Sequence, residues 1–323
     1  MFALPRIVFF GTPVFAVASL DRLVDAGYPV VAVVTAPDKP SGRGLKKNAS
    51  PVKQSALSHG IPVLQPTNLK DAEFLQQLKG FRPDIQIVIA FRMLPQAVWS
   101  LPPLGTFNLH ASLLPQYRGA APINHAIMNG ESMTGVTTFY INERIDTGSI
   151  LLAERVTIAP DETAGELHDR LMTAGAILAL RTVAGVVDGT ITETPQEVLV
   201  TDPASLHAAP KIFREDCRIN WKREAKSVHD FIRGLSPVPG AFTDLRKKDG
   251  TSYNLKILRA FPEHSDDAGT PGEFITDGKS SLKVKVADGF IHLAGVQLSG
   301  RKPMSCGDFL RGFGWIFSET HGI

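Results

Sequence analysis

Cysteine is scarce in this chain: Cys217 and Cys306 are the only two among its 323 residues. They lie far apart and without metal-ligand spacing, which argues against a disulfide framework and against a cysteine-based zinc site. We expect two inert thiols in the reducing cytoplasm. Two phosphate-binding motifs, Gly-x-x-x-x-Gly-Lys-Ser/Thr and Gly-x-Gly-x-x-Gly, are also missing, so the sequence indicates neither ATP nor NAD.

Long apolar runs are missing as well. The run at residues 85–90 is typical, and it is far shorter than the roughly 20 apolar residues of a membrane span. Residues 1–10 show no basic region followed by an apolar stretch and a small-residue cleavage site, because Arg6 falls inside the apolar run. We therefore expect a strand there rather than a signal peptide, and no membrane partner.

Neither sign of charge is in large excess, since the formal net charge is +2 and charged residues make up 20% of the chain. The excess is uneven. Residues 206–323 hold 18 Lys+Arg against 14 Asp+Glu, whereas residues 1–205 hold 16 against 18. A mildly basic C-terminal part is compatible with a polyanionic partner, and equally with an ordinary solvated surface.

What the first half does contain is an alternation of strand and helix signals. Runs such as 30–35, rich in β-branched residues, indicate strands buried on both faces. Segments with apolar residues at helical spacing separate them and end at glycines such as Gly27 and Gly60. This alternation predicts a Rossmann-like, doubly wound and mostly parallel α/β sheet. The expected strands are 6–10, 30–35, 61–64, 85–90, 105–110, 135–141 and 150–158, and the expected helices are 15–26, 51–59, 70–79 and 163–187.

The composition changes after Gly189. Residues 190–210 contain three prolines and many Thr and Ala, which is typical of an extended linker. From 211 onward the expected strands are short and interrupted by Gly, Asp and Pro, which predicts a small OB-like β-barrel. We therefore predict a first domain at 1–189, a linker at 190–210 and a C-terminal domain at 211–323.

The strongest chemical pattern lies at the end of one expected strand. Asn108 and His110 are two residues apart, so their side chains point to the same face. Ligands of open parallel sheets bind beyond the carboxyl ends of strands. There an amide and an imidazole can stabilise a developing oxyanion, and a charged imidazole can deliver a proton. Asp146, in an expected turn, would orient such a ring. A buried core histidine and an ordinary Asp-Thr-Gly turn explain the same residues.

A resemblance decides between these readings. Three segments are similar to the signature of the 10-formyltetrahydrofolate formyltransferases: Asn108-x-His110, Ser112-Leu-Leu-Pro115-x-x-Arg118-Gly119, and Asp146-Thr-Gly148. The resemblance implies Asn108, His110 and Asp146 as the catalytic set. It also implies 10-formyltetrahydrofolate as the formyl-donor cosubstrate, with no metal.

Further segments resemble the branch of this family whose acceptor is initiator methionyl-tRNA, and they extend the resemblance over nearly the whole chain. They are Phe10-Gly-Thr-Pro13, the run from Pro37 to Lys53, Ser236-Pro237-x-Pro239-Gly240, and Gln297-Leu-Ser-Gly300-Arg301-Lys302. This implies formylation of the methionine α-amine for translation initiation. It also makes 1–189 the catalytic domain and 211–323 the tRNA-binding domain.

The resemblance also supplies candidate binding residues. The folate pocket would be lined by residues that follow three strands. At 91–93 and 142–144 this sequence departs from the commoner family pattern. Its members are Phe91, Arg92, Met93, Leu94, Ser112, Leu113, Leu114, Pro115, Asn142, Glu143 and Arg144. The tRNA contacts would come from the basic loop 38–47 and from the C-terminal domain. They are Lys39, Arg43, Lys46, Lys47, Lys211, Arg301 and Lys302.

Other functions share this catalytic set. A sugar-nucleotide N-formyltransferase, a glycinamide ribonucleotide formyltransferase and a formyltetrahydrofolate hydrolase would differ in the acceptor. A tRNA-binding protein without catalytic activity belongs to another class, and the intact Asn108, His110 and Asp146 disfavour it. The loop around Arg43 and the basic C-terminal part favour tRNA as the acceptor. We expect a monomeric, cytoplasmic enzyme.

Overall fold

The structure, a computed structural model, describes residues 4–318 except 42–45, 247–249 and 268. Two compact units divide the chain, and each draws on several segments. Unit 1 comprises Met1–Gly119, Thr134–Val156 and His168–Ala208, and unit 2 comprises Ala120–Met133, Thr157–Leu167 and Ala209–Ile323. The predicted limits 1–189, 190–210 and 211–323 cut the chain only twice and stay a prediction.

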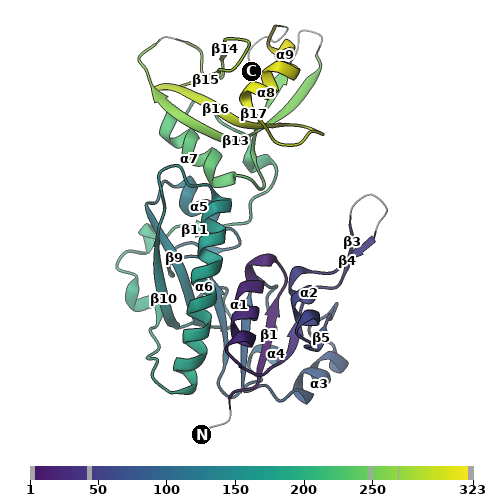
Figure 1. Ribbon diagram of the computed structural model, residues 1–323. Helices are drawn as coiled ribbons and strands as arrows, with labels where there is room; N and C mark the ends of the chain where they lie inside the picture. The colour runs from purple at the N-terminus through teal and green to yellow at the C-terminus, as the bar shows by residue number, and fades with distance from the viewer. Residues whose placement is uncertain (1–3, 42–45, 247–249, 268, 319–323) are drawn as a thin grey trace. The chain divides into compact units, whose positions relative to one another are not determined.

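Unit 1 is built on a seven-stranded sheet with the order β10-β9-β7-β6-β1-β2-β5 (Figure 1). β1 pairs in parallel with β2 and β6, and β6 pairs in parallel with β7. β9 runs antiparallel to β7. The predicted mostly parallel sheet is therefore confirmed. The strands are β1 (Ile7–Gly11), β2 (Val30–Val34), β5 (Val63–Leu64), β6 (Ile85–Ile89), β7 (Thr106–His110), β9 (Met133–Tyr140) and β10 (Ile150–Thr157).

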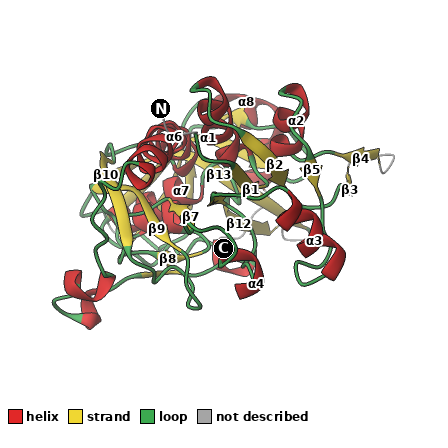
Figure 2. Cartoon of the chain, turned by 90° about the horizontal axis from the view of Figure 1, so that it is seen from below, coloured by secondary structure: helices red, strands yellow, loops and turns green. Residues whose placement is uncertain are grey.

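Helices cover both faces of this sheet (Figure 2). One face packs Val8, Phe10 and Val88 against α3 and α4, which contribute Phe74 and Val98. α1 and α6 lie on the other face (Figure 2). Local caps set two of the helix starts, because Ser50 accepts from the Lys53 amide and Asp71 from the Phe74 amide. The helices are α1 (Val14–Asp25), α2 (Pro51–Ser58), α3 (Ala72–Gly80), α4 (Gln96–Trp99) and α6 (Ala164–Val187).

α6 is long and apolar enough, by length and composition, to cross a membrane. The sequence shows no uninterrupted apolar run of that length here, because polar residues separate the apolar positions of the helix. The helix packs against the sheet instead: the Thr182 hydroxyl lies 2.8 Å from that of Thr138 on β9. A Cβ on Gly175 would lie 2.7 Å from a methyl carbon of Leu109, so the glycine permits close approach of helix and strand. These contacts are those of a core helix.

A short hairpin occupies part of the segment predicted as a loop at 38–47. β3 (Lys39–Ser41) pairs antiparallel with β4 (Lys46–Asn48). It projects away from the rest of unit 1 (Figure 1). The predicted loop is thus partly β-structure, which its Gly, Ser and Pro residues did not indicate.

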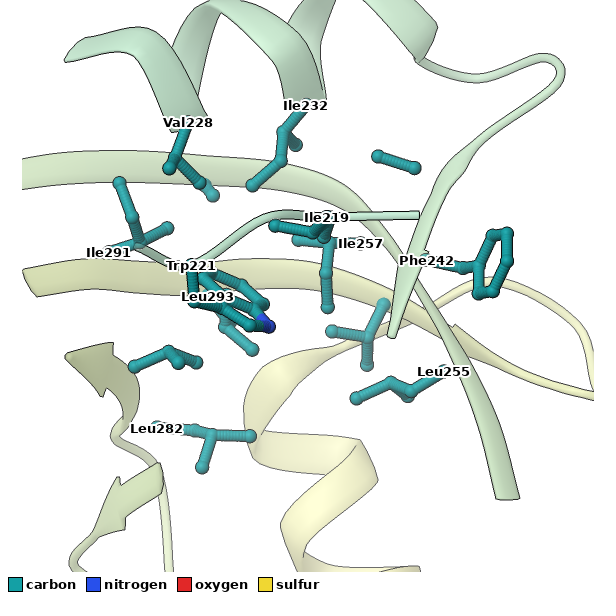
Figure 3. Packing of buried hydrophobic residues seen from close by; sticks show 14 of the residues in the cluster. Ile219, Trp221, Val228, Ile232, Phe242, Leu255, Ile257, Leu282, Ile291 and Leu293 are labelled. Carbon is teal, nitrogen blue, oxygen red and sulfur yellow. The ribbon is translucent and has the colours of Figure 1, made fainter. Parts of the chain in front are cut away.

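Unit 2 is an antiparallel sheet with the order β12-β13-β16-β15-β14, and β17 pairs with β16. The sequence predicted a small OB-like β-barrel here, and the structure has a C-terminal antiparallel β domain. Its core lies between the sheet and α7 (Ala225–Leu235), where Val228 and Ile232 of the helix approach Trp221, Ile257 and Ile291 (Figure 3). The strands are β12 (Ala241–Arg246), β13 (Ser252–His264), β14 (Phe274–Thr276), β15 (Leu282–Val286), β16 (Gly289–Leu298) and β17 (Met304–Ser305).

Segments from the first half of the chain complete unit 2. α5 (Pro122–Met128) packs on α7, and the Asn124 amide donates to the Gly234 carbonyl at 2.7 Å.

The remaining elements of the two units are short. They are β8 (Arg118–Gly119), the 3-10 turns at Gln196–Leu199, Pro203–Ser205 and Glu215–Cys217, β11 (Ala208–Ala209), α8 (Cys306–Phe313) and α9 (Trp315–Ser318).

Candidate active site

Asn108 and His110 lie on β7, as predicted, in the interior of the sheet between β6 and β9. The pleat directs both side chains to one face. His110 is 7% exposed, and Asn108 is half-buried. Among residues 4–318 that the structure describes, no group hydrogen-bonds the Asn108 side-chain amide. This amide is therefore available as a donor beside the imidazole.

One nitrogen of the His110 ring is already engaged. Nε2 lies 2.9 Å from the carbonyl oxygen of Tyr117. A carbonyl can only accept, so Nε2 carries a hydrogen and donates it. Nδ1 is the ring nitrogen that is left to exchange a proton. It lies 3.9 Å from Oδ2 of Asp146, an ion-pair distance that is too long for a hydrogen bond.

Asp146 lies in the turn between β9 and β10, as predicted. Its φ of 54° is left-handed, a conformation that non-glycine residues seldom adopt. Its Oδ2 accepts from the Gly119 amide at 3.0 Å. The carboxylate is therefore held by a backbone donor from the segment after His110, in a position that faces the imidazole. The spacing of Asp146 in the sequence did not indicate this contact.

The loop after β7 is fastened to the neighbouring strand. The Thr137 hydroxyl on β9 donates to the Ser112 carbonyl at 2.7 Å and accepts from the Leu114 amide at 3.2 Å. The Ser112 hydroxyl donates to the Gln116 carbonyl at 2.6 Å. These bonds shape the turn that brings the Tyr117 carbonyl back to His110. Thr137 was not recognised in the sequence, because it stands within an ordinary strand pattern.

Two family models match most of the chain. The model described as "Formyl transferase" matches residues 5–183, and the model described as "Formyl transferase, C-terminal domain" matches residues 211–314. The chain belongs to the formyl transferase family. Methionyl-tRNA formyltransferase of Bacteroides fragilis is 50% identical over 95% of this chain and 95% of its own length. That of Parabacteroides distasonis is 51% identical over 98% of each.

Solved structures share the formyl transferase fold at low sequence identity. HypX from Aquifex aeolicus in complex with tetrahydrofolic acid aligns with a TM-score of 0.64 and 18% identity, over 98% of this chain and 48% of that one. An N-formyltransferase from Helicobacter canadensis, in complex with folinic acid and dTDP-3-aminofucose, aligns with a TM-score of 0.63 and 20% identity, over 90% and 99%. At this identity the likeness concerns the fold alone.

The residues predicted to form the folate pocket of this formyl transferase differ in exposure. Leu94, Ser112 and Leu114 are buried, at 6%, 0% and 5% exposure, so their side chains are core contacts. Met93 is 69% exposed. The remainder are half-buried or exposed: Phe91, Arg92, Leu113, Pro115, Asn142, Glu143 and Arg144.

Two of these predicted pocket residues have structural contacts of their own. The Arg92 guanidinium donates to the carbonyls of Pro66 and Thr67, the latter at 2.8 Å. The Asn142 side chain accepts from the Arg144 amide at 2.9 Å and from the Thr147 hydroxyl at 3.1 Å. Asn142 thus shapes the loop that carries Asp146. Direct contact of either residue with the folate stays a prediction.

The residues predicted to bind tRNA fall into two groups. Lys39, Lys46 and Lys47 lie in the β3–β4 hairpin of unit 1. Arg43 lies outside the described residues. In unit 2, Lys211, Arg301 and Lys302 are exposed. Contacts of these residues with tRNA phosphates stay a prediction.

Proposed function

We propose that this formyl transferase moves the formyl group of 10-formyltetrahydrofolate to the free α-amine of methionine on initiator tRNA, which gives N-formylmethionyl-tRNA for translation initiation. One observation carries the proposal: relatives named methionyl-tRNA formyltransferase are 50% and 51% identical over nearly the full length of both chains. The tetrahydrofolic acid in a structure of the same fold supports a folate as the donor.

Asn108, together with His110, stabilises the negative charge that develops during the reaction. When bound, the folate would supply a formyl carbon for attack by the methionine amine. A bond forms between the amine nitrogen and this carbon, and the bond from the carbon to N10 of the folate breaks. The amine loses one proton, and N10 gains one. The Asn108 amide lacks a partner among the described residues. It can therefore donate a hydrogen bond to the formyl oxygen as that oxygen gains negative charge. The adjacent imidazole, once Nδ1 carries a proton, stabilises the same charge.

Proton movement falls to His110 and Asp146. Because Nε2 donates to the Tyr117 carbonyl, Nδ1 is the nitrogen that takes up and returns a proton. The Asp146 carboxylate lies 3.9 Å from Nδ1, so its charge faces the nitrogen that exchanges the proton. The Gly119 amide donates to this carboxylate and holds it in a position that faces the ring.

The tRNA would be held through its phosphates. In this proposal the 38–47 segment, with Lys39, Arg43, Lys46 and Lys47, contacts the acceptor end. Lys211, Arg301 and Lys302 contact the backbone elsewhere. Replacing Arg43 by Ala should weaken formylation of initiator tRNA at physiological salt. An unchanged rate would refute the role of Arg43 without affecting the catalytic set.

The assembly state and location belong to the same proposal. A monomer in the cytoplasm, with no membrane partner, agrees with a tRNA substrate and with two buried free cysteines. Light scattering of the purified protein at micromolar concentration tests the first part. A stable dimer would contradict it.

One assay tests the acceptor. Labelled 10-formyltetrahydrofolate is incubated with the protein and with charged initiator tRNA, charged elongator tRNA or an amino-sugar nucleotide. We expect label on initiator methionyl-tRNA and much less on the other two. Transfer to the sugar nucleotide alone would overturn the tRNA proposal while leaving formyl transfer intact.

A further inference from the structure

Gln196 is a fully buried polar residue within the segment that the sequence indicates as a linker. Its exposure is 0%, and it begins the 3-10 turn Gln196–Leu199. Its Nε2 donates to the Asp146 carbonyl at 3.0 Å and to the Gly148 carbonyl at 2.8 Å. Its Oε1 accepts from Nε and Nη2 of Arg118 at 3.1 and 2.7 Å.

These four partners fix the orientation of the amide. Carbonyls only accept, and a guanidinium only donates. Turning the amide of Gln196 by 180° would place two acceptors, or two donors, against each other at every contact. The side chain therefore has one satisfactory arrangement, and each polar atom of the amide group has its partners.

The amide joins the two segments that hold the Asp146 carboxylate. One is the Asp146–Gly148 backbone, and the other is Arg118, whose neighbour Gly119 donates to Asp146 Oδ2 at 3.0 Å. Asp146 is thus held at its carbonyl by Gln196 and at its carboxylate by Gly119. A shift of either segment would change the distance from the carboxylate to His110.

Two further features make this loop depend on its contacts. The left-handed φ of Asp146 persists only where the surroundings favour it. On the other side, a Cβ on Gly148 would lie 1.6 Å from the Tyr140 carbonyl oxygen, so the loop runs close to the β9 backbone and only glycine fits there. Removal of the Gln196 contacts would leave the Asp146 and Gly148 carbonyls without this donor.

We propose that Gln196 is a positioning residue of the active site, and that its side-chain amide keeps the Asp146 carboxylate facing Nδ1 of His110. This inference rests on the proposed function. It makes the predicted linker a part of the catalytic machinery, although Gln196 touches no reacting atom. No pattern in the sequence distinguishes Gln196 from a solvated residue, because its partners lie 48 to 78 residues away.

The test uses two variants at this position and one control. Gln196→Met removes all four hydrogen bonds at similar volume. Gln196→Glu keeps an acceptor for Arg118 but has no donor for the two carbonyls, and the new ion pair with Arg118 helps it fold. Gln86→Met is the control: Gln86 is also 0% exposed and accepts one hydrogen bond, from Thr106, away from Asp146.

We expect kcat for formylation of initiator methionyl-tRNA to fall on the order of 10²-fold in both Gln196 variants, since displacement of a catalytic group by about 1 Å has this effect. KM for the folate and for tRNA should change by less than about threefold. In an Asp146→Asn background, Gln196→Met should lower kcat by no more than about threefold further, because the two changes act on one group. Gln86→Met should leave kcat unchanged.

Hydrogen exchange gives a readout that does not depend on activity. Amides of residues 141–149 should exchange faster in Gln196→Met than in Gln86→Met. If wild-type protein transfers no formyl group and this exchange still rises, the proposed function fails and the positioning contact stands. Wild-type kcat in both Gln196 variants would overturn the inference. It would also be overturned if the fold-losses of kcat for Gln196→Met and Asp146→Asn multiplied in the double variant.

Discussion

Replacing Asp146 by Asn removes the charge that faces His110 and keeps the geometry. The Asn side chain retains an oxygen that can accept from the Gly119 amide, so the loop keeps its backbone contact. What is lost is the attraction between the carboxylate and a charged imidazole, whose Nδ1 lies 3.9 Å from Oδ2. The two side chains are 9% and 16% exposed, so solvent screens the interaction only in part.

Coulomb's law gives the size of this loss. At 3.9 Å, two unit charges attract by about 1 kcal/mol in water and by about 4 kcal/mol at the effective dielectric constant of about 20 that applies near protein surfaces. Each 1.4 kcal/mol, roughly, corresponds to a tenfold change in rate. If the charged ring forms in the transition state, Asp146→Asn slows formyl transfer by between about sixfold and about 10³-fold. Burial favours the upper part of this range.

The assay is single-turnover formylation of charged initiator tRNA at saturating folate. Asp21→Asn is the matched control, because Asp21 also pairs with a histidine: its Oδ1 lies 3.1 Å from Nε2 of His59. That pair is 28% and 41% exposed, and such pairs contribute about 0–1 kcal/mol. The control should transfer formyl at the wild-type rate. A loss below about threefold in Asp146→Asn, or equal losses in both variants, would refute the electrostatic role.

Three further predictions concern stability and the thiols. Phe309→Ala should lower the free energy of unfolding by about 3–5 kcal/mol in urea denaturation, because the fully buried ring packs on Phe313 and Phe317; a loss under about 1 kcal/mol would contradict this. The pKa of His229 lies below its ordinary value of 6.5. The larger cause is burial of the ring, and the second is the nearby positive charge of Arg233. The folded state therefore binds fewer protons than the unfolded state. The stability that the neutral His229 ring contributes is fully present above about pH 6.5, and it is lost as the pH falls through the folded pKa. His229→Asn should lose less stability between pH 7.5 and 5.5 than the wild type, and an equal loss would count against the buried neutral ring. Burial also raises the pKa of both cysteine thiols, so iodoacetamide should modify Cys217 and Cys306 only after unfolding; rapid labelling of the native protein would contradict this.

The sequence predicted those parts of the fold that depend on local periodicity. Segments dominated by apolar residues form buried strands such as β1 and β6, and segments with helical spacing form α1 and α6. The antiparallel direction of β9 was not predicted, because an apolar run does not reveal which way a strand lies. The β3–β4 hairpin was also missed, since turn-forming residues hid two short strands.

The site was predicted less completely than the fold. The strand period placed Asn108 and His110 on one face, whereas Asp146 came from the family resemblance. The contacts that orient these groups join distant residues: Tyr117 with His110, Gly119 with Asp146, and Gln196 with both loops. Such contacts follow from the tertiary fold, so a single sequence without partners in space does not reveal them.

The central claim is that formyl transfer to initiator methionyl-tRNA depends on the Asn108 amide as an oxyanion donor. The most direct measurement is single-turnover transfer of labelled formyl from 10-formyltetrahydrofolate by wild-type protein and by Asn108→Ala. Loss of one such donor typically lowers the rate by about 10²–10³-fold, and we expect a loss of that size with folate binding retained. A loss below about threefold, or a wild-type protein that leaves methionyl-tRNA unmodified, would contradict the claim.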